Sequence, residues 1–375
     1  MLKQIDEIGI KKYAAEFNSL VTTPDQDIFY FAKAANENHP FAYEVRRSEF
    51  DEIMFKNCQQ KGVEALEGMT VTDTELHAPI KKLQARDEQG IEHEFTGHYL
   101  IDASGRDTVL ARQLNSKQKN SQHPMAAIFG HFHNVERRTG KDEGNISIYW
   151  FQHGWVWMIP LKDGVMSVGC VCWPDYLKTR DTSLNEFFLQ TLQRVPAINK
   201  RMENALLEGN AQATGNYSYH SNIMSGDGFL LIGDAYAFVD PVFSSGVYLA
   251  MQSATWGADL VNQLLDNSQH SKKLIGQFEN TIKQEIKAFS WFIYRFNTPA
   301  FHKLFMSSDE ASQHPVKQKL KSAVISVLAG DTNNVQIKLP LITFKLFYHF
   351  NRLIEFKENR AFAKFRKRQN MAVKG

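Results

Sequence analysis

The stretch GFLLIGDAYAFVDPVFSSGVYLAMQSA, residues 228–254, decides how this chain folds. Its apolar run 229–232 predicts a buried strand that ends at Gly233-Asp234, and the periodic segment after Gly246 predicts a helix. This order places an acid, Asp234, at the carboxyl end of a strand. It also aims free backbone N–H groups at the helix start, where an anion or the edge of an electron-rich ring is stabilised. The alternative is that Asp, Pro and Gly in this loop only stabilise a turn and bind no ligand.

Length and composition indicate an ordinary globular protein of two or three domains. The 375 residues are 43% hydrophobic and 22% charged. A chain of this length and composition can form a hydrophobic core that needs no disulfide bonds for stability. A net charge of +2 does not indicate a nucleic-acid partner, and the cationic run 364–368 predicts a solvated tail. The three cysteines are too few for a disulfide framework or a structural zinc site, which favours a reducing cytoplasm. Apolar runs are short, so we expect no integral membrane segment.

Turn formers and apolar runs predict the other elements. We expect a hairpin of strands 19–23 and 28–32 around Pro24-Asp25, a helix capped by Ser48 that runs to about Gly62, a strand at 63–66 and a β-meander that reaches residue 95. Strands at 127–135, 146–151, 155–160 and 165–173 predict one antiparallel sheet that covers a cavity. Residues 183–209 predict a pair of helices, and the chain after about residue 262 reads as helical.

Several polar residues could serve a ligand, each with a simpler alternative. Asp102-Ala103-Ser104-Gly105 follows an apolar strand, and its glycine permits close backbone approach, although Asp and Ser before a helix are commonly caps. Arg46 and Arg47 precede a helix and could equally be a solvated helix start. His131 and His133 share a face, but no third ligand is spaced to help them, so we expect no metal site.

These stretches together resemble FAD-binding proteins of the flavoprotein monooxygenase type. Residues 233–241 match the motif G-D-A-x-x-x-x-D-P, and residues 45–51 match V-x-R-x-x-F-D. The resemblance implies that Asp234 holds the ribityl chain, that the helix start faces the flavin ring, and that Arg47 serves the phosphates. The cofactor-binding residues that it implies are Arg47, Asp102, Ser104, Gly105, Gly233, Asp234, Pro241, Gly246 and Val247.

Two further motifs narrow the resemblance. Residues 155–160 match W-x-W-x-I-P, and residues 238–246 match F-x-x-P-x-x-S-x-G at every fixed position. Without further motifs, two tryptophans on one face of a strand would indicate only that their rings pack over a hydrophobic core. Because both motifs occur in the expected order, the chain resembles flavin-dependent halogenases. It is most similar to the tryptophan-7-halogenase-like branch that includes enzymes acting on phenols and pyrroles.

That resemblance implies a mechanism and its participants. A separate flavin reductase delivers reduced FAD, and chloride or bromide is oxidised near Ser245-Gly246. A lysine then directs the hypohalous acid to an electron-rich arene, either free or bound to a carrier protein. Residues 12–17, KYAAEF, are similar to the segment K-Y-G-A-x-F that supplies this lysine, which makes Lys12 the candidate. Lys11 beside it is the alternative, and Trp155 and Trp157 would keep the arene away from the flavin.

The predicted fold is α/β: a glutathione-reductase-like, Rossmann-type FAD sheet, an antiparallel substrate domain and a helical C-terminal region. No G-x-G-x-x-G is present, so we expect the chain to begin after the first βαβ unit of such a fold. The expected segments are a partial FAD domain with a substrate-side hairpin at 1–125, the antiparallel sheet at 126–215, an FAD-domain return at 216–262 and helices at 263–375. A flavin monooxygenase, a geranylgeranyl-reductase-like oxidoreductase or an inactive truncated homologue remain alternatives.

Overall fold

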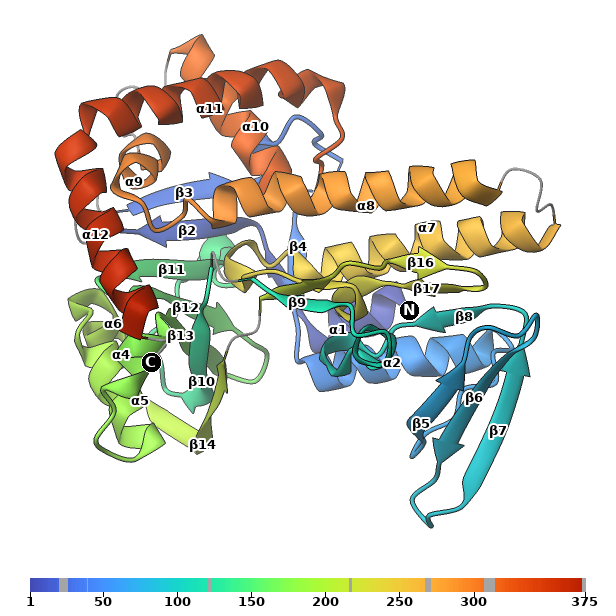
Figure 1. Cartoon of the computed structure of the whole chain (residues 1–375). Coiled ribbons are helices and arrows are strands. Elements are labelled where there is room, and N and C mark those ends of the chain that lie inside the picture. Colours follow the sequence, from blue (N-terminus) through green and yellow to red (C-terminus); the bar gives the residue numbers. More distant parts are fainter. Residues whose placement is uncertain are drawn as a thin grey trace. The chain divides into compact units, whose positions relative to one another are not determined.

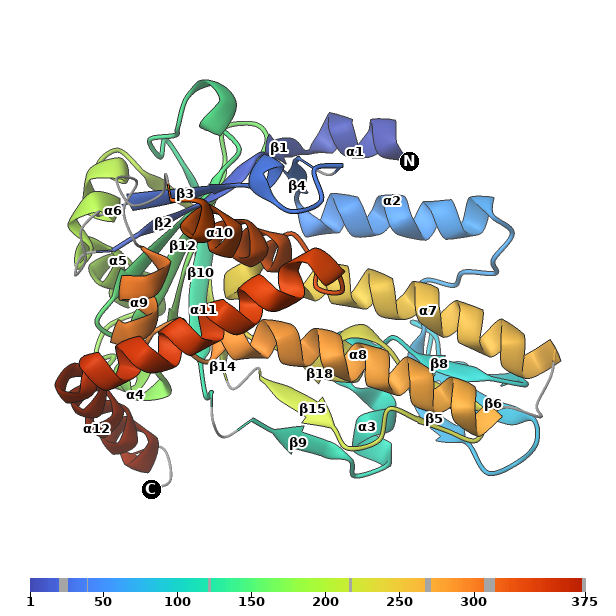
Figure 2. The same ribbon diagram turned by 90° about the horizontal axis from the view of Figure 1, so that it is seen from above.

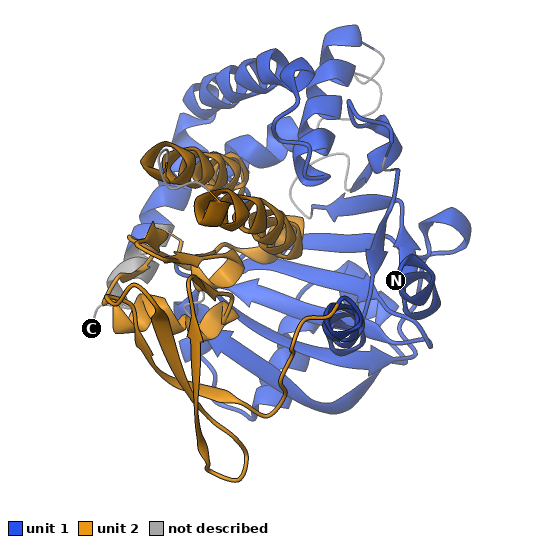
Figure 3. Ribbon diagram, turned by 90° about the vertical axis from the view of Figure 1, so that its right-hand side faces the viewer, with its two compact units in different colours: residues 1–61, 124–216, 294–375 blue, residues 62–123, 217–293 orange. Residues whose placement is uncertain are grey.

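The computed structural model describes residues 1–19, 26–38, 40–120, 123–215, 218–266, 271–306 and 314–372. The chain forms two compact units, which Figure 3 colours separately. Unit 1 comprises residues 1–61, 124–216 and 294–375, and unit 2 comprises residues 62–123 and 217–293. Residues 1–125, which we expected to form one segment, are therefore divided between the units after residue 61. The functions expected for the four segments stay predictions.

Unit 1 is built on a seven-stranded sheet, which confirms the strands predicted between residues 126 and 173 (Figure 1). The strand order is β14-β10-β13-β12-β11-β2-β3, and the pair β1-β4 stands apart from this sheet. The strands of unit 1 are β1 (Ile10–Lys12), β2 (Ala14–Asn18), β3 (Gln26–Tyr30), β4 (Ala42–Glu44), β10 (Ala126–His133), β11 (Ile146–Phe151), β12 (Gly154–Pro160), β13 (Met166–Cys172) and β14 (Leu206–Gly215).

The N-terminal strands give this sheet a feature that the sequence did not predict. β2 lies parallel to β11, whereas the other neighbours in the sheet are antiparallel. β3 pairs with β2. Residues 20–25 lie outside the described residues, and with them most of the strand predicted at 19–23 and the expected turn. Strand β1 begins at Ile10, directly after α1 and Gly9.

Unit 1 also contains several helices. They are α1 (Leu2–Ile8), α2 (Arg47–Gln60), α4 (Pro174–Lys178), α5 (Leu184–Gln193), α6 (Pro196–Arg201), α9 (Pro299–Phe305), α10 (Pro315–Leu328), α11 (Val335–Ile354) and α12 (Phe356–Ala372). Two boundaries correct our predictions. Helix α2 begins at Arg47 after the N-cap residue Arg46, so Ser48 is not its cap. The helices expected at 183–209 end at Arg201, because the following residues pair with β10 as β14.

Two apolar layers form the core of unit 1. One contains residues of β10, β12 and β13 together with α5 and α6, such as Phe132, Val168 and Phe188. The other is aromatic: the ring centroid of Phe17 lies 4.7 Å from that of Phe305, and Trp150 lies 4.7 Å from Phe296. Burial of such rings contributes the largest single apolar areas in a core.

A histidine is enclosed in the aromatic layer. The His302 ring centroid lies 4.2 Å from that of Trp150, and its Nε2 atom is buried without a hydrogen-bond partner among the described residues. Burial disfavours the imidazolium and lowers the pKa of His302 from 6.5 to about 4, although a hydrogen bond with the Phe296 backbone acts in the opposite direction.

This pKa shift predicts a pH-dependent stability. The unfolded chain binds a proton at His302 below pH 6.5, whereas the folded chain binds it only near pH 4. Folding stability should therefore be complete above pH 6.5 and fall by up to about 3 kcal/mol as the pH drops towards 4. Urea unfolding at a series of pH values measures this loss. His302→Phe should remove most of it, while His349→Gln, at an exposed position, should not. Equal pH profiles of wild type and His302→Phe would contradict the assignment.

Unit 2 contains three small sheets and two long helices. Its strands are β5 (Thr70–Glu75), β6 (Lys81–Arg86), β7 (Glu92–Gly97), β8 (Leu100–Asp102), β9 (Lys117–Lys119), β15 (Tyr219–Ser221), β16 (Ser225–Gly226), β17 (Phe229–Leu231) and β18 (Ala237–Phe238). The meander β5-β6-β7 is confirmed, but residues 63–66 form no strand. β17 lies between β16 and β8 and is parallel to β8, so the two motif-bearing loops follow adjacent parallel strands.

The predicted order of strand, loop and helix after residue 228 is confirmed. β17 leads into the helix α7 (Gly246–Asp266), and α7 lies beside α8 (Ser271–Ile293) (Figure 2). Between β17 and α7 the chain forms the short turns η4 (Gly233–Ala235) and η5 (Pro241–Phe243). The core of unit 2 joins the buried strand residues Leu230 and Leu231 to Leu260 and Phe278 of these helices. None of the described helices is both long and apolar enough to cross a membrane.

Candidate functional site

The loop after β17 is fixed against α7 through Gly233. This residue has φ +53°, and a Cβ placed on it would lie 3.0 Å from the Cβ of Ala250. Its N–H donates a hydrogen bond of 3.0 Å to the Ser253 hydroxyl. A side chain at position 233 would therefore strain the backbone and press on α7, so glycine is required here for the loop itself.

Asp234 follows in η4 and is partly buried. The Tyr219 hydroxyl donates a hydrogen bond of 2.8 Å to the Asp234 carbonyl oxygen. Burial, and then the nearby Asp234 carboxylate, raise the pKa of Tyr219 well above its usual value. The acid is therefore placed directly after the parallel strand, as predicted, and its backbone is held by a neutral tyrosine.

Asp240, the second aspartate of the motif G-D-A-x-x-x-x-D-P, is buried in this loop, although we did not assign it a role from the sequence. It is 1% exposed; its Oδ1 atom accepts the Val242 N–H at 3.1 Å, and its Oδ2 atom lies 3.0 Å from His123 Nε2. This carboxylate caps η5 and pairs with a buried imidazole. An Asp directly before Pro241 is typical of a turn cap, so the sequence indicated this part of its role. Nothing in the neighbouring sequence indicated that His123 is its partner.

Polar groups without partners gather where α7 begins. Ser244 has the left-handed φ of +53°, and Ser245 after it is 4% exposed, with an Oγ atom that has no hydrogen-bond partner among the described residues. The Leu249 N–H is bonded to the Ser245 carbonyl at 2.9 Å, which leaves the N–H groups of the first turn outside the helix ladder. A Cβ on Gly246 would meet no atom within 4 Å, so there is open space at this helix start.

This helix start fits an anion or the electron-rich edge of a cofactor ring. A buried hydroxyl without a partner costs free energy unless a ligand or water satisfies it. The N-terminus of a 21-residue helix adds partial positive charge at the same place. Val247 is 36% exposed and Pro241 is exposed as well, so both could contact such a ligand.

In the loop after β8 the polar side chains accept hydrogen bonds from nearby backbone N–H groups. The two carboxylate oxygens of Asp102 accept the N–H groups of Ser104 at 2.9 Å and Leu110 at 2.8 Å, and Ser104 Oγ accepts the Val109 N–H at 3.0 Å. Gly105 has φ +62°, and a Cβ there would meet nothing within 4 Å. Asp102 and Ser104 thus shape the loop, while Gly105 offers the accessible backbone.

Lys12 of unit 1 is buried. It is 7% exposed, and its Nζ lies 2.8 Å from the Glu44 carboxylate on the neighbouring strand β4. The adjacent backbone is fixed, because Asn145 Oδ1 accepts the N–H groups of Tyr13 at 3.2 Å and Ala14 at 2.8 Å. Sequence reasoning did not identify Glu44 as the partner. The structure therefore presents a positioned, charge-paired amine on a strand.

Lys11, the alternative, has a different environment. Its side chain is 44% exposed and lies 3.5 Å from the Asp6 carboxylate and 4.9 Å from the centre of the Phe41 ring. It lines a shallow hollow of about 390 Å³ together with Tyr13. Adjacent residues on a strand point to opposite faces, so the two lysines cannot serve the same site.

Arg47 lies in the first turn of α2 and is exposed. Its Nε and Nη2 atoms donate hydrogen bonds of 3.0 and 3.1 Å to the two Asp51 carboxylate oxygens, one turn further along α2. Arg46, the N-cap residue, is less exposed and lies 3.9 Å from Glu49. A surface pair of this kind is weak and could exchange for a phosphate, so Arg47 stays a predicted phosphate ligand.

The two tryptophans of β12 occupy the same face, with ring centroids 5.8 Å apart. Trp155 is 2% exposed and packs towards Phe296, whereas Trp157 is partly exposed and its Nε1–H donates a hydrogen bond of 3.2 Å to Ser167 Oγ. The ring of Trp157 covers Gly169 on β13, where a Cβ would lie 2.2 Å from it. The glycine leaves room for the ring, and the shielding role of both tryptophans stays a prediction.

The predicted histidine pair is not grouped with further ligands. His133 lies 3.5 Å from Glu208, and burial, then the charge of Arg46, lower the pKa of His131. Across the part of the chain that the structure describes, no three His, Cys, Asp or Glu residues are arranged to hold a metal ion.

Comparison with known proteins gives one family. Residues 3–322 match the model of the family described as tryptophan halogenase. The chain is 33% identical over 233 residues to a tryptophan 2-halogenase of Chondromyces crocatus, covering 60% of this chain and 45% of that protein. It is 28% identical over 301 residues to a 1H-pyrrole-2-carbonyl-[peptidyl-carrier protein] chlorinase of Pseudomonas fluorescens, covering 78% and 66% respectively. The chain thus spans between about half and two thirds of the length of these curated relatives.

A solved structure shares the fold. A flavoprotein/dehydrogenase from Cytophaga hutchinsonii superposes with a TM-score of 0.82 at 23% identity, over 93% of this chain and 83% of that one. The predicted α/β architecture with a helical C-terminal region is confirmed by this similarity and by the sheets and helices of the two units.

Proposed function

The chain belongs to the tryptophan halogenase family, and on that premise we propose that it takes part in FAD-dependent halogenation of an electron-rich aromatic compound. The observation that carries the proposal is the buried Lys12, which lies at the position where the resemblance to the family requires an amine and is fixed by Glu44 and by the Asn145 contacts. An unpaired surface lysine would give no reason to expect chemistry there.

The residues of unit 2 suit the binding of FAD. We propose that Gly233 and Asp234 accept the ribityl chain and that the start of α7, with Gly246 and Val247, lies against the flavin ring. Gly105 would admit backbone contact with the dinucleotide. Arg47 belongs to unit 1 and stays the phosphate ligand that the family resemblance implies. When bound in its reduced form, FAD supplies the oxidising power, drawn from O₂, that converts a halide into hypohalous acid. The unpartnered Ser245 hydroxyl and the free N–H groups beside it suit a chloride or bromide by charge.

Lys12 would hold and orient the oxidised halogen. Its ammonium group can donate a hydrogen bond to hypohalous acid, or the free amine can carry the halogen transiently. The arene then takes the halogen in place of a ring proton, and the hydroxide and the proton leave as water. Trp155 and Trp157 would separate the arene from the flavin, which limits competing hydroxylation.

The relatives support a proposal for the substrate class. The Pseudomonas fluorescens protein is described as acting on a pyrrole-2-carbonyl group held by a peptidyl-carrier protein. We therefore propose a phenol or pyrrole, free or bound to a carrier protein, with a separate flavin reductase as partner. All three cysteines are free, two of them buried, which suits a reducing compartment such as the cytoplasm.

Product mass tests the proposal. The purified protein is supplied with FAD, a flavin reductase, O₂, bromide and a panel of phenols and pyrroles, free and carrier-bound. A product with the bromine isotope pattern is expected. Hydroxylated product instead would indicate a flavin monooxygenase, and a reduced product an oxidoreductase of the geranylgeranyl-reductase type. Lack of any flavin binding would favour an inactive homologue.

Asp234→Ala should weaken FAD binding. The substitution removes the carboxylate proposed to accept the ribityl hydroxyls, and a charge-assisted hydrogen bond contributes about 1.5–3 kcal/mol, or roughly ten- to a hundredfold in Kd. Titration of FAD followed by flavin fluorescence measures the change. Asp227→Ala, at a fully exposed carboxylate of the same unit, is the matched control. An Asp234→Ala protein with unchanged FAD affinity would remove Asp234 from the site.

A further inference from the structure

Helix α11 exposes an apolar stripe that the described residues of unit 1 leave uncovered. Figure 1 shows α9 and α10 on the side of α11 that faces β2 and β3, and Ile337, Phe344 and Tyr348 are buried on that side. The opposite side of the helix carries large apolar side chains that are 55–76% exposed. These are Val335, Leu339, Ile342, Leu346, Phe350 and Leu353.

The spacing of these residues makes the stripe continuous. Steps of three and four residues keep side chains on one face of a helix, so the stripe runs the length of α11, about 30 Å. A contiguous apolar face of this size on a folded protein marks a surface that binds another body. Scattered exposed apolar residues would need no such explanation.

Cations flank the stripe in a regular row. Lys338, Lys345 and Arg352 follow one another at intervals of seven residues, close to two helical turns, and so lie along one side of it. Residues 335–372 contain nine Lys and Arg and two Glu, a net charge of +7, whereas the whole chain carries +2. The rest of the chain is therefore net negative, and the positive charge is concentrated on α11 and α12.

We infer that the apolar stripe of α11 and the cations beside it form a docking surface for an anionic lipid bilayer. A helix with an apolar face and a Lys/Arg border lies in the membrane interface, with its apolar residues among the acyl chains and its cations near the headgroups. A second copy of this chain would bring one +7 segment against another. A protein partner would need a groove that is complementary to the apolar stripe of α11, whereas lipid acyl chains can pack around the stripe without such a groove.

A cavity between α10 and α11 supports the choice of lipid. It has a volume of about 520 Å³ and is lined by apolar residues of α10 and α11, including Leu320, Val324, Phe344 and the partly exposed Phe347. Lys303, Lys317 and Lys321 also line it, but Lys303 is paired with Glu355, and Lys321 is paired with Asp27, which lines the cavity as well. The cavity is therefore an apolar hollow whose positive charge is largely neutralised, and it suits the acyl chain of a lipid rather than the anionic headgroup.

Vesicle flotation tests the inference on the full chain. We expect the protein to float with vesicles of phosphatidylcholine and phosphatidylglycerol, much less with phosphatidylcholine alone, and less at high salt. Leu346→Glu/Leu353→Glu should reduce flotation by at least about tenfold, because it places two charges in the apolar stripe. Leu265→Glu, which changes a 56% exposed leucine of α7, should float like the wild type.

A second variant separates docking from folding. Lys338→Glu/Arg352→Glu changes two exposed side chains and leaves the stripe intact, and we expect it to lose the preference for anionic vesicles. The inference is overturned if the wild type does not float, or if the Leu346→Glu/Leu353→Glu variant floats equally well. It is also overturned if sedimentation without lipid shows a dimer that this variant dissociates, since a second copy would then cover the stripe.

Discussion

Lys12→Ala is expected to abolish halogenation and to leave the oxidation of reduced FAD by O₂ intact. The lysine acts on the halogen after the flavin has reacted, so its loss should affect the transfer to the arene alone. A positioned acid or base contributes roughly 10²–10⁴-fold to a rate, which sets the expected fall in kcat for halogenated product. Product analysis by mass and O₂ consumption, measured on the same sample, separate the two steps.

The neighbouring lysine provides the matched control. Lys11→Ala removes an exposed amine from the opposite face of β1 and should keep halogenation within a fewfold of wild type. Because Lys12→Ala leaves the buried Glu44 carboxylate without its partner, Lys12→Met/Glu44→Gln serves as a second variant that removes the amine and the charge together. Halogenation that survives in both Lys12 variants but not in Lys11→Ala would transfer the role to Lys11.

The parts of the fold that the sequence predicted correctly are local. The strand, turn and helix of residues 229–266 follow from an apolar run, Gly233 and the periodic segment after Gly246, which are neighbours along the chain. The strands β11, β12 and β13 are separated by short turns, and each pairs with its neighbour in the sequence. Local pattern is sufficient for such elements because each is stabilised by residues close to it in sequence.

The features that the sequence did not predict depend on distant partners. Strand β2 is parallel to β11, more than a hundred residues away, and no pattern within KYAAEF specifies that neighbour. The same holds for the site: Asp240 pairs with His123, and Lys12 with Glu44, through folding alone. The resemblance identified Lys12 and Asp234 because the residues next to them match the family motifs. It did not identify the residues that hold these two side chains in place.

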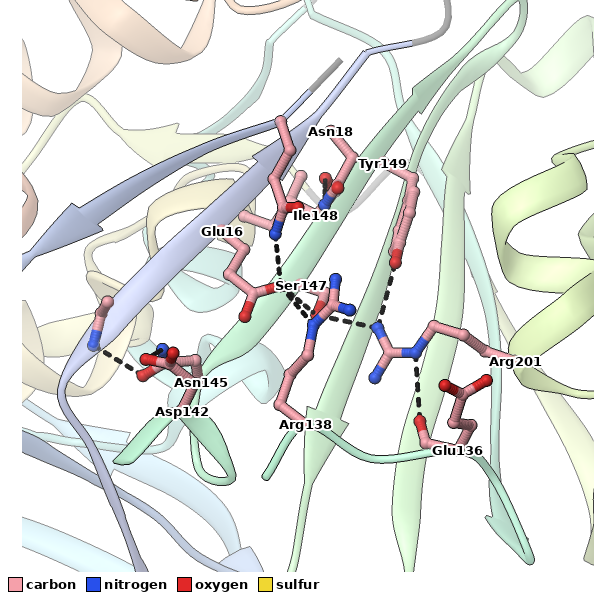
Figure 4. A network of polar contacts seen from close by, with 12 residues as sticks. Glu16, Asn18, Glu136, Arg138, Asp142, Asn145, Ser147, Ile148, Tyr149 and Arg201 are labelled. Carbon is pink, nitrogen blue, oxygen red and sulfur yellow. Dashed lines mark hydrogen bonds and ion pairs between the residues drawn. The ribbon is translucent and has the colours of Figure 1, made fainter. Parts of the chain in front are cut away.

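A buried network of polar side chains links the parallel strands β2 and β11 (Figure 4). Glu16, on β2, is 1% exposed, and its Oε2 atom accepts hydrogen bonds from Ser147 Oγ at 3.1 Å and Arg138 Nε at 3.0 Å. Arg201 Nη1 donates to Ser147 Oγ at 2.9 Å and to Tyr149 Oη at 3.0 Å. The segment KYAAEF thus places a buried charge at the third residue of β2, a few residues from Lys12.

Glu16→Ala should therefore destabilise unit 1 more than any surface change. Removing Glu16 leaves the Arg138 cation without its carboxylate and the Ser147 hydroxyl without its acceptor, and breaking a buried ion pair costs roughly 3–5 kcal/mol. The expectation is the lower end of that range, because Arg138 is partly exposed. Urea unfolding followed by tryptophan fluorescence measures it, since Trp150, Trp155 and Trp157 lie in the same sheet.

Two comparisons make this measurement specific. Glu143→Ala removes an exposed carboxylate 3.9 Å from Arg137 and should change stability by less than about 1 kcal/mol. Arg138→Ala should shrink the effect of Glu16→Ala when the two are combined, because the pair is then already broken. If Glu16→Ala cost no more than Glu143→Ala, the network would not be what holds β2 against β11. The fixed position of Lys12 on the preceding strand would then have to come from Asn145 and Glu44 alone.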